Sequence, residues 1–146
     1  MFLTDVVNSG AIPTLSFAMS FAARRQTILA HNIANLDTPN FQPRNVSTRD
    51  FQRVLGEAID RRRAGTGGAR GPLQWKETRE LRHGPGGSLR LSPQTAASGI
   101  LFHDRNNRDL ERMMQDLAEN VGVFRVVTDL LRSQFSQIKD AIAERV

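Results

Sequence analysis

The 146-residue sequence contains no cysteine and no tyrosine, and its aromatic residues are eight phenylalanines and a single tryptophan. The lack of cysteine excludes disulfide bonds, thiol catalysis and thiolate metal sites. It does not decide the compartment, because an exported protein without disulfides fits this composition as well as a cytosolic one. Stability must therefore come from packing within the chain or from contacts with neighbouring molecules.

Apolar residues are also scarce. They make up 39% of the chain, below the share of about 45–50% that is usual in globular domains. No apolar run approaches the roughly 20 residues needed to span a bilayer, so we expect no direct membrane span. The first fifteen residues contain Asp5 and no basic residue, and they lack the three-part pattern of a secretory signal. If the protein leaves the cytoplasm, we expect it to do so without a cleaved signal peptide.

The formal charge is +5, and most of the basic excess is arginine in the middle of the chain. A basic balance suits nucleic acid, an anionic membrane or an acidic protein partner. The arginines concerned are Arg61, Arg62, Arg63, Arg70, Arg79, Arg82 and Arg90. Aromatic residues are not interleaved with them, as a single-strand binder would require. A solvated arginine-rich surface is the simpler interpretation, and a nucleic-acid-associated basic helical protein is the alternative, which rests on charge alone.

The C-terminal forty residues carry the clearest pattern, an apolar repeat that averages 3.5 residues. Its spacings alternate between four and three, which is typical of a helix packed along another helix. The positions of this pairing face are Leu110, Met114, Leu117, Val121, Phe124, Thr128, Leu131, Phe135, Ile138 and Ile142. A helix over these 33 residues would be roughly 50 Å long, too long to bury its apolar face within a compact chain of this size.

A second amphipathic helix is predicted over residues 14–36. Its apolar positions recur at helical spacing on one face. The positions expected to pair with the C-terminal helix, either antiparallel or parallel to it, are Leu15, Met19, Ala22, Leu29 and Ile33. The polar side of this helix is marked by Arg24, Arg25 and Gln26.

The C-terminal helix also has a second apolar edge. Its residues are Met113, Val123, Val127 and Leu130. One partner helix cannot cover both faces, and the chain supplies only one other long helix. We therefore expect this edge to contact other subunits, which indicates an assembly protein.

The middle of the chain is less regular. Pro39 and Asn40 suit the central positions of a turn, because asparagine tolerates a positive φ angle. Residues 41–46 are expected to be extended, and a short helix with Phe51, Val54 and Ile59 on its apolar face follows the capping-box-like start at Ser47.

Two glycine-containing stretches follow. Residues 64–72 are interpreted as a flexible linker. Weak alternation on both sides of residues 84–87 favours a small β-hairpin. Residues 93–103 are interpreted as a second linker, after which Asn106 or Asn107 is expected to cap the long helix.

The predicted fold is therefore mainly α, with the terminal amphipathic helices paired in an elongated, coiled-coil-like arrangement around an irregular middle. The predicted division is a flexible N-terminus (1–13), an axial helical domain (14–36 with 106–146), a segment of turn, extended chain and short helix (37–63), and a loose middle segment (64–105).

No arrangement of side chains indicates catalysis. His31, His83 and His103 lack ligand spacing and belong to no H-E-x-x-H pattern. The glycines of residues 65–71 lack the Gly-Lys-Ser/Thr ending of a phosphate loop. We interpret His31 as structural or surface-exposed and Trp75 as a packing anchor, and we expect no enzyme activity, metal or cofactor.

The segment from Ala30 to Phe41 reads AHNIANLDTPNF. An amphipathic helix followed by N-I-A-N, Thr-Pro and an aromatic residue resembles the N-terminal motif of bacterial flagellar axial proteins. The motif residues in this chain are Asn32, Ile33, Ala34, Asn35, Thr38, Pro39 and Phe41. Residues 44–55, 106–111 and 117–120 are similar to proximal rod proteins of the FlgB type, and the resemblance covers about half of the chain, at both ends.

The sequence departs from that family at three places. The family usually has glycine and tyrosine where Asn40 and Phe41 stand, and glycine where Arg105 stands. Asparagine can adopt the same backbone turn, and phenylalanine keeps the ring while losing the hydroxyl.

The resemblance implies a structural subunit of the proximal rod of the bacterial flagellar basal body. Such proteins are exported unprocessed by the flagellar type III apparatus, and their terminal helices pack into a drive shaft that transmits torque and surrounds the export channel. The implied partners are copies of the chain, other rod proteins, the rod adaptor protein, the inner-membrane ring and the export apparatus, with no nucleic acid. The implied location is the rod in the periplasmic space.

Overall fold

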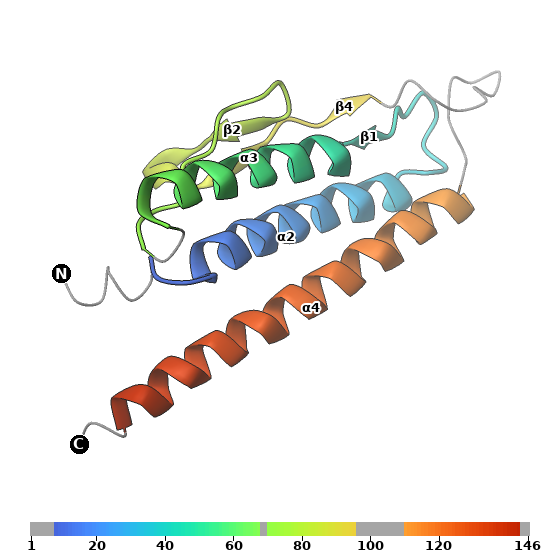
Figure 1. The fold of residues 1–146 in the computed structure, drawn as a ribbon. Helices are drawn as coiled ribbons and strands as arrows, with labels where there is room; N and C mark the ends of the chain where they lie inside the picture. The colour runs from blue at the N-terminus through green and yellow to red at the C-terminus, as the bar shows by residue number, and fades with distance from the viewer. Residues whose placement is uncertain (1–7, 68–69, 96–109, 144–146) are drawn as a thin grey trace. The chain divides into compact units, whose positions relative to one another are not determined.

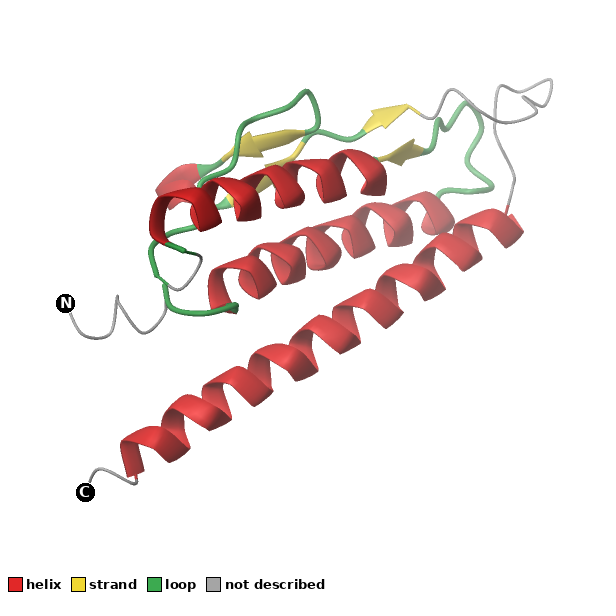
Figure 2. Cartoon of the chain, viewed as in Figure 1, coloured by secondary structure: helices red, strands yellow, loops and turns green. Residues whose placement is uncertain are grey.

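The computed structural model describes residues 8–67, 70–95 and 110–143. Its helices are α2 (Ile12–Ala34), α3 (Thr48–Thr66) and α4 (Leu110–Ala143), shown in Figure 1. The strands are short: β1 (Arg44–Asn45), β2 (Leu81–His83), β3 (Leu89–Leu91) and β4 (Gln94–Thr95), drawn as yellow arrows in Figure 2. The predicted mainly α fold with a less regular middle is confirmed. None of the described helices combines the length and apolar character needed to cross a bilayer.

The first helix begins and ends two residues before its predicted bounds. Ile12 and Pro13, expected in a flexible N-terminus, form the first turn of α2. Proline is well suited to this place because the first turn of a helix does not use its backbone N–H groups. Ile12 is buried, so the start of the helix is held by packing.

The second helix extends beyond its predicted end. Residues 64–66, interpreted from the sequence as the start of a linker, belong to the last turn of α3. The helix ends where Gly67 adopts a φ of +66° and its N–H bonds the carbonyl of Arg63 at 2.9 Å. Glycine adopts this left-handed conformation without steric cost and commonly ends helices.

The predicted β-hairpin is present. Strands β2 and β3 pair antiparallel, with Leu81 opposite Leu91 and His83 opposite Leu89. A 3₁₀ turn, η1 (Pro85–Gly87), connects them. Leu81 and Leu89 are buried, so the hairpin contributes one apolar face to the core.

A second strand pair was not predicted. Arg44 and Asn45 of β1 pair antiparallel with Thr95 and Gln94 of β4. Residues 94–95 were interpreted from the sequence as part of a linker, so that interpretation is wrong there. The rest of that linker beyond Thr95, and the proposed caps Asn106 and Asn107, lie outside the described residues.

The chain forms two compact units. The first comprises Met1–Met19, Thr48–Lys76 and Phe124–Val146, and the second comprises Ser20–Ser47 and Glu77–Val123. Each unit therefore takes part of both long helices and part of the middle of the chain.

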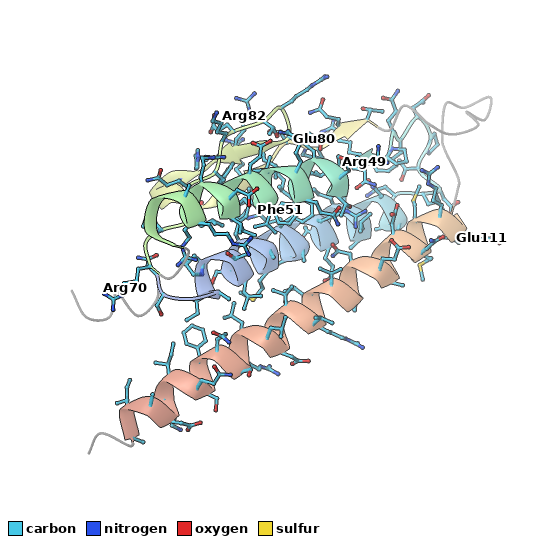
Figure 3. The ribbon with its side chains drawn as sticks, viewed as in Figure 1. Arg49, Phe51, Arg70, Glu80, Arg82 and Glu111 are labelled. Carbon is cyan, nitrogen blue, oxygen red and sulfur yellow. The ribbon has the colours of Figure 1, made fainter. Side chains whose placement is uncertain are left out.

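An aromatic cluster forms the core of the first unit. The ring of Phe17 lies 5.3 Å from that of Phe51 and 5.0 Å from that of Trp75, between ring centroids. All three side chains are buried, and Figure 3 labels Phe51 on α3. The interpretation of Trp75 as a packing anchor is confirmed.

A buried arginine lies near this core. Arg62 of α3 donates to the carbonyls of Gly10 at 2.7 Å and Asn8 at 2.8 Å, just before α2 begins. The sequence placed Arg62 on a solvated surface together with its neighbours Arg61 and Arg63, which are indeed exposed. Arg62 instead binds the backbone immediately before α2 and so fixes where this helix begins.

In the second unit, α2 and α4 pack against each other. Arg25 Nη2 donates to Asp116 Oδ1 at 3.2 Å, and Asn120 Nδ2 donates to the Ala22 carbonyl at 2.8 Å. The residue number falls along α2 as it rises along α4, so the two helices are antiparallel. Arg25, assigned by its charge to the polar side of α2, is buried, because its guanidinium reaches a carboxylate on the partner helix.

Candidate assembly surface

The predicted pairing face is only partly covered within the chain. On α2, Ala22 and Leu29 are buried, whereas Leu15, Met19 and Ile33 are half-buried. On α4, the half-buried members are Leu117, Val121, Phe124, Thr128, Leu131 and Ile138. The exposed members are Leu110, Met114, Phe135 and Ile142. A single chain therefore leaves part of this face in contact with solvent.

The second apolar edge is divided in a different way. Val123 and Leu130 are exposed, but Met113 and Val127, expected to face other subunits, are buried within the chain. Met113, Asn120 and Val127 are all buried and lie seven residues apart, which brings them to nearly the same side of a helix. The polar Asn120 interrupts this line in the sequence, and for this reason the apolar pattern alone placed Met113 and Val127 on the wrong side.

One flank of α4 presents an apolar surface that the chain does not cover. Val123, Val126 and Leu130 are 53%, 59% and 50% exposed. Their spacings of three and four residues place them on one side of the helix. The sequence did not single out Val126. We refer to these three residues as the apolar flank.

The buried residues Met113, Asn120 and Val127 form a line along α4, which we call the buried line. The exposed members of the pairing face lie on the side of this line opposite to the apolar flank. Leu110, Met114 and Phe135 are displaced around the helix in the sense opposite to the apolar flank. Exposed apolar residues therefore border the buried line on both sides. Contiguous exposed apolar surface of this kind marks protein–protein contact sites.

The family motif folds the chain back on itself after α2. Asn32 is buried, and its side-chain amide makes two hydrogen bonds with the backbone of Arg44. Its Nδ2 donates to the Arg44 carbonyl at 2.6 Å, and its Oδ1 accepts from the Arg44 N–H at 3.1 Å. The side chain thus pairs with β1 as a neighbouring strand would, and it joins the end of α2 to the extended segment.

The turn predicted at Pro39 and Asn40 lies between these two points. The Phe41 N–H bonds the Thr38 carbonyl at 3.2 Å, and Asn40 has a φ of +60°. Proline at the second position and a positive φ at the third define a type II turn. This is the turn that the sequence predicted.

His31 and Asn35 complete the same region. Asn35 Nδ2 donates to the His31 carbonyl at 2.8 Å, at the end of α2. The His31 ring lies edge-on to the ring of Phe41, with centroids 5.7 Å apart. His31 is thus an exposed residue that contacts Phe41 and Asn35, which agrees with the structural or surface role inferred from the sequence.

The backbone at Asn40 provides a direct test of this turn. We expect Asn40→Val to lower the free energy of unfolding by about 1–2 kcal/mol, because a β-carbon is disfavoured in the left-handed region. Asn40→Gly should change it by less than about 0.5 kcal/mol, since glycine adopts this conformation freely. Urea unfolding measures both changes, and Gln42→Val at an exposed neighbouring position is the control. Equal stability of the valine and glycine variants would contradict this account of the turn.

The ion pairs that Arg53 forms on α3 lie at the surface. On α3, hydrogen bonds from Arg53 to Asp50 and Glu57 raise the pKa of the Arg53 guanidinium, the contribution of Asp50 being the larger. Within the described residues, no group of three or more histidine, aspartate and glutamate side chains could hold a metal ion.

Comparison with known proteins agrees with the family motif. The family described as "Flagella basal body rod protein" matches residues 12–42, which cover α2 and the turn that follows it. Among curated proteins, the flagellar basal body rod protein FlgB of Bacillus subtilis is 28% identical over 136 residues, covering 92% of this chain and 94% of the relative. FlgB of Proteus mirabilis is 31% identical over 117 residues, covering 80% of this chain and 82% of the relative.

A further relative is similar to the same extent. FlgB of Yersinia enterocolitica is 31% identical over 118 residues, covering 76% of this chain and 77% of the relative. The similarity thus extends over most of the sequence in several bacteria and includes the segment in which Asn32 joins α2 to β1. The chain belongs to the FlgB family of flagellar basal body rod proteins, which are structural subunits of the rod.

Proposed function

We propose that this chain is a subunit of the proximal rod and polymerises with copies of itself and other rod proteins. The assembled rod acts as a drive shaft that transmits torque and surrounds the export channel. The observation that carries the proposal is the exposure of apolar residues on both sides of the buried line of α4. An isolated helix pair leaves these residues exposed to solvent, whereas a tube of packed helices buries them.

The energetics favour assembly. Fully burying one Val, Leu, Met or Phe side chain contributes about 1.5–3 kcal/mol. The large exposed apolar residues of α4 are Leu110, Met114, Val123, Val126, Leu130, Phe135 and Ile142. Each is about half exposed, so burying the rest of it contributes about half of that value, and burial of the whole set would offset the several kcal/mol that association costs in lost freedom of motion.

The proposal also includes specific partners and a route. The chain contacts the rod adaptor protein and the inner-membrane ring, and it reaches the periplasmic space through the flagellar type III apparatus without loss of a signal peptide. The pairing face and the apolar flank are its contact surfaces within the rod. A nucleic-acid role has only the basic charge in its favour, and Arg62 of that basic set is buried.

Complementation tests the proposal. The chain is expressed in a motile bacterium that lacks its own protein of this family, and basal bodies are purified and examined by mass spectrometry. We expect swimming to be restored and the chain to be present in the rod with its full, unprocessed mass. Rods that assemble and rotate without the chain, or a chain confined to the cytoplasm, would refute the proposal.

A further inference from the structure

Two buried polar residues, Arg25 and Asn120, and the half-buried Asp116 lie where α2 and α4 pack against each other. Arg25 is 6% exposed and Asn120 is 4% exposed, and both bond across the interface, to Asp116 and to the Ala22 carbonyl. Arg25 Nε is itself buried without a hydrogen-bond partner. A guanidinium that is only partly satisfied is costly to bury, so stability alone does not account for its presence.

The apolar part of the interface does not define one alignment. Met113 and Val127 lie seven residues on either side of Asn120, and all three positions are buried. Sliding α4 by seven residues along α2 would therefore bring an apolar side chain to the place that Asn120 occupies. Such a slip moves the helix by about 10 Å and returns nearly the same face to its partner.

The polar contacts do distinguish these alignments. After a slip of seven residues in one direction, Arg25 would stand opposite Val123 instead of Asp116, and its charge would lose its partner. In either direction the Ala22 carbonyl would face Met113 or Val127, neither of which can donate a hydrogen bond, and the buried Asn120 amide would lose its acceptor. A polar side chain within an apolar helix interface specifies register in this way.

We infer that Arg25, Asp116 and Asn120 are positioning residues that fix the register of α4 on α2. They determine which residues of α4 stand opposite α2, and therefore which part of the apolar flank remains available to neighbouring subunits. The register is a property of the single chain and does not depend on the proposed rod function.

The cysteine-free sequence permits a direct measurement of register. Cysteines replace the exposed Ala30 on α2 and Ala118 on α4, each carries a nitroxide label, and pulsed dipolar spectroscopy gives the distance between the labels. In the full chain with its polar residues intact, we expect one narrow distance distribution. In the variant Arg25→Met/Asp116→Leu/Asn120→Leu, we expect a second distance population, which arises from an axial displacement of α4 by about 10 Å, one seven-residue step.

A matched control separates register from general effects. The same three apolar residues are introduced at exposed neighbours, as Arg24→Met/Gln115→Leu/Glu119→Leu, and the single distance should be retained. Circular dichroism should show unchanged helix content in both variants. The unfolding midpoint of the Arg25/Asp116/Asn120 variant should not fall, because apolar residues replace the buried Arg25 and its half-buried partner.

Two results would overturn the inference. One is a single, unchanged distance in the variant that lacks all three polar residues. The other is a broad distribution already present in the chain that retains them. Neither outcome bears on incorporation into rods, so the register inference and the proposed function fail separately.

Discussion

The double substitution Val126→Glu/Leu130→Lys is expected to reduce incorporation of the chain into rods by roughly 100-fold or more, while the single chain remains folded. Val126 is 59% exposed and Leu130 is 50% exposed, so their replacement removes little packing within the chain. Because each is about half exposed, burying the rest of it in an assembly contributes about half of the ~1.5–3 kcal/mol of full burial. A charge buried in its place adds a desolvation cost, and every ~1.4 kcal/mol is a factor of ten. The new Glu and Lys stand four residues apart in the orientation that stabilises helices.

A control on the same helix isolates the apolar contribution. Arg125→Glu/Asp129→Lys introduces the same two residues at the same spacing, at exposed positions that are already charged. We expect this variant to support swimming and to appear in purified basal bodies at the normal level. Normal rods from the Val126/Leu130 variant, or equal defects in both variants, would show that the apolar flank does not carry the assembly contacts.

Local backbone chemistry accounts for the features that the sequence predicted best. Pro39 fixes its own φ and restricts Thr38, and Asn40 tolerates a positive φ, so the type II turn follows from residues adjacent in the chain. The hairpin of residues 81–91 was predicted because glycines of η1 separate two alternating stretches. The helical character of α2 and α4 follows from their apolar periodicity in the same way, with a helical spacing in α2 and a repeat averaging 3.5 residues in α4.

The features that the sequence did not predict depend on contacts between distant residues. Arg25 and Asn120 look like surface residues by composition, and only the antiparallel approach of α2 and α4 gives them a carboxylate and a carbonyl to bind. These contacts fix the orientation of α4 about its own helix axis. In this orientation Met113 and Val127 are buried and Val126 is exposed.

The β1–β4 strand pair also depends on contacts between residues that are separated in the sequence. Two-residue strands carry almost no periodic signal, and this pair is positioned by the Asn32 side chain, which engages the backbone of Arg44. The family resemblance identified Asn32 as part of a motif, but its role in joining α2 to β1 is visible only in the structure.

The largest loss of stability is expected for Phe17→Ala. Its ring contacts both Phe51 and Trp75 in the core of the first unit, and it is 8% exposed. Removing a buried phenylalanine costs about 3–5 kcal/mol through lost apolar burial and the cavity left behind. A domain is commonly stable by only about 5–15 kcal/mol, so the variant should unfold at much lower urea concentration or lose its cooperative transition.

The single tryptophan makes this cluster directly observable. Because the chain has no tyrosine, its intrinsic fluorescence reports on Trp75 alone, which lies against the ring of Phe17. Phe135→Ala is the matched control: it deletes the same side chain from an exposed position on α4, 43% accessible, and should shift the unfolding transition by less than about 1 kcal/mol. Phe17→Ala should also shift Trp75 emission to longer wavelength in the folded state, since water then reaches the indole. If both alanine variants unfold at the same urea concentration, the aromatic cluster does not hold the first unit together, and α2 and α3 must be stabilised by the contacts of Ile12, Val54 and Ala58.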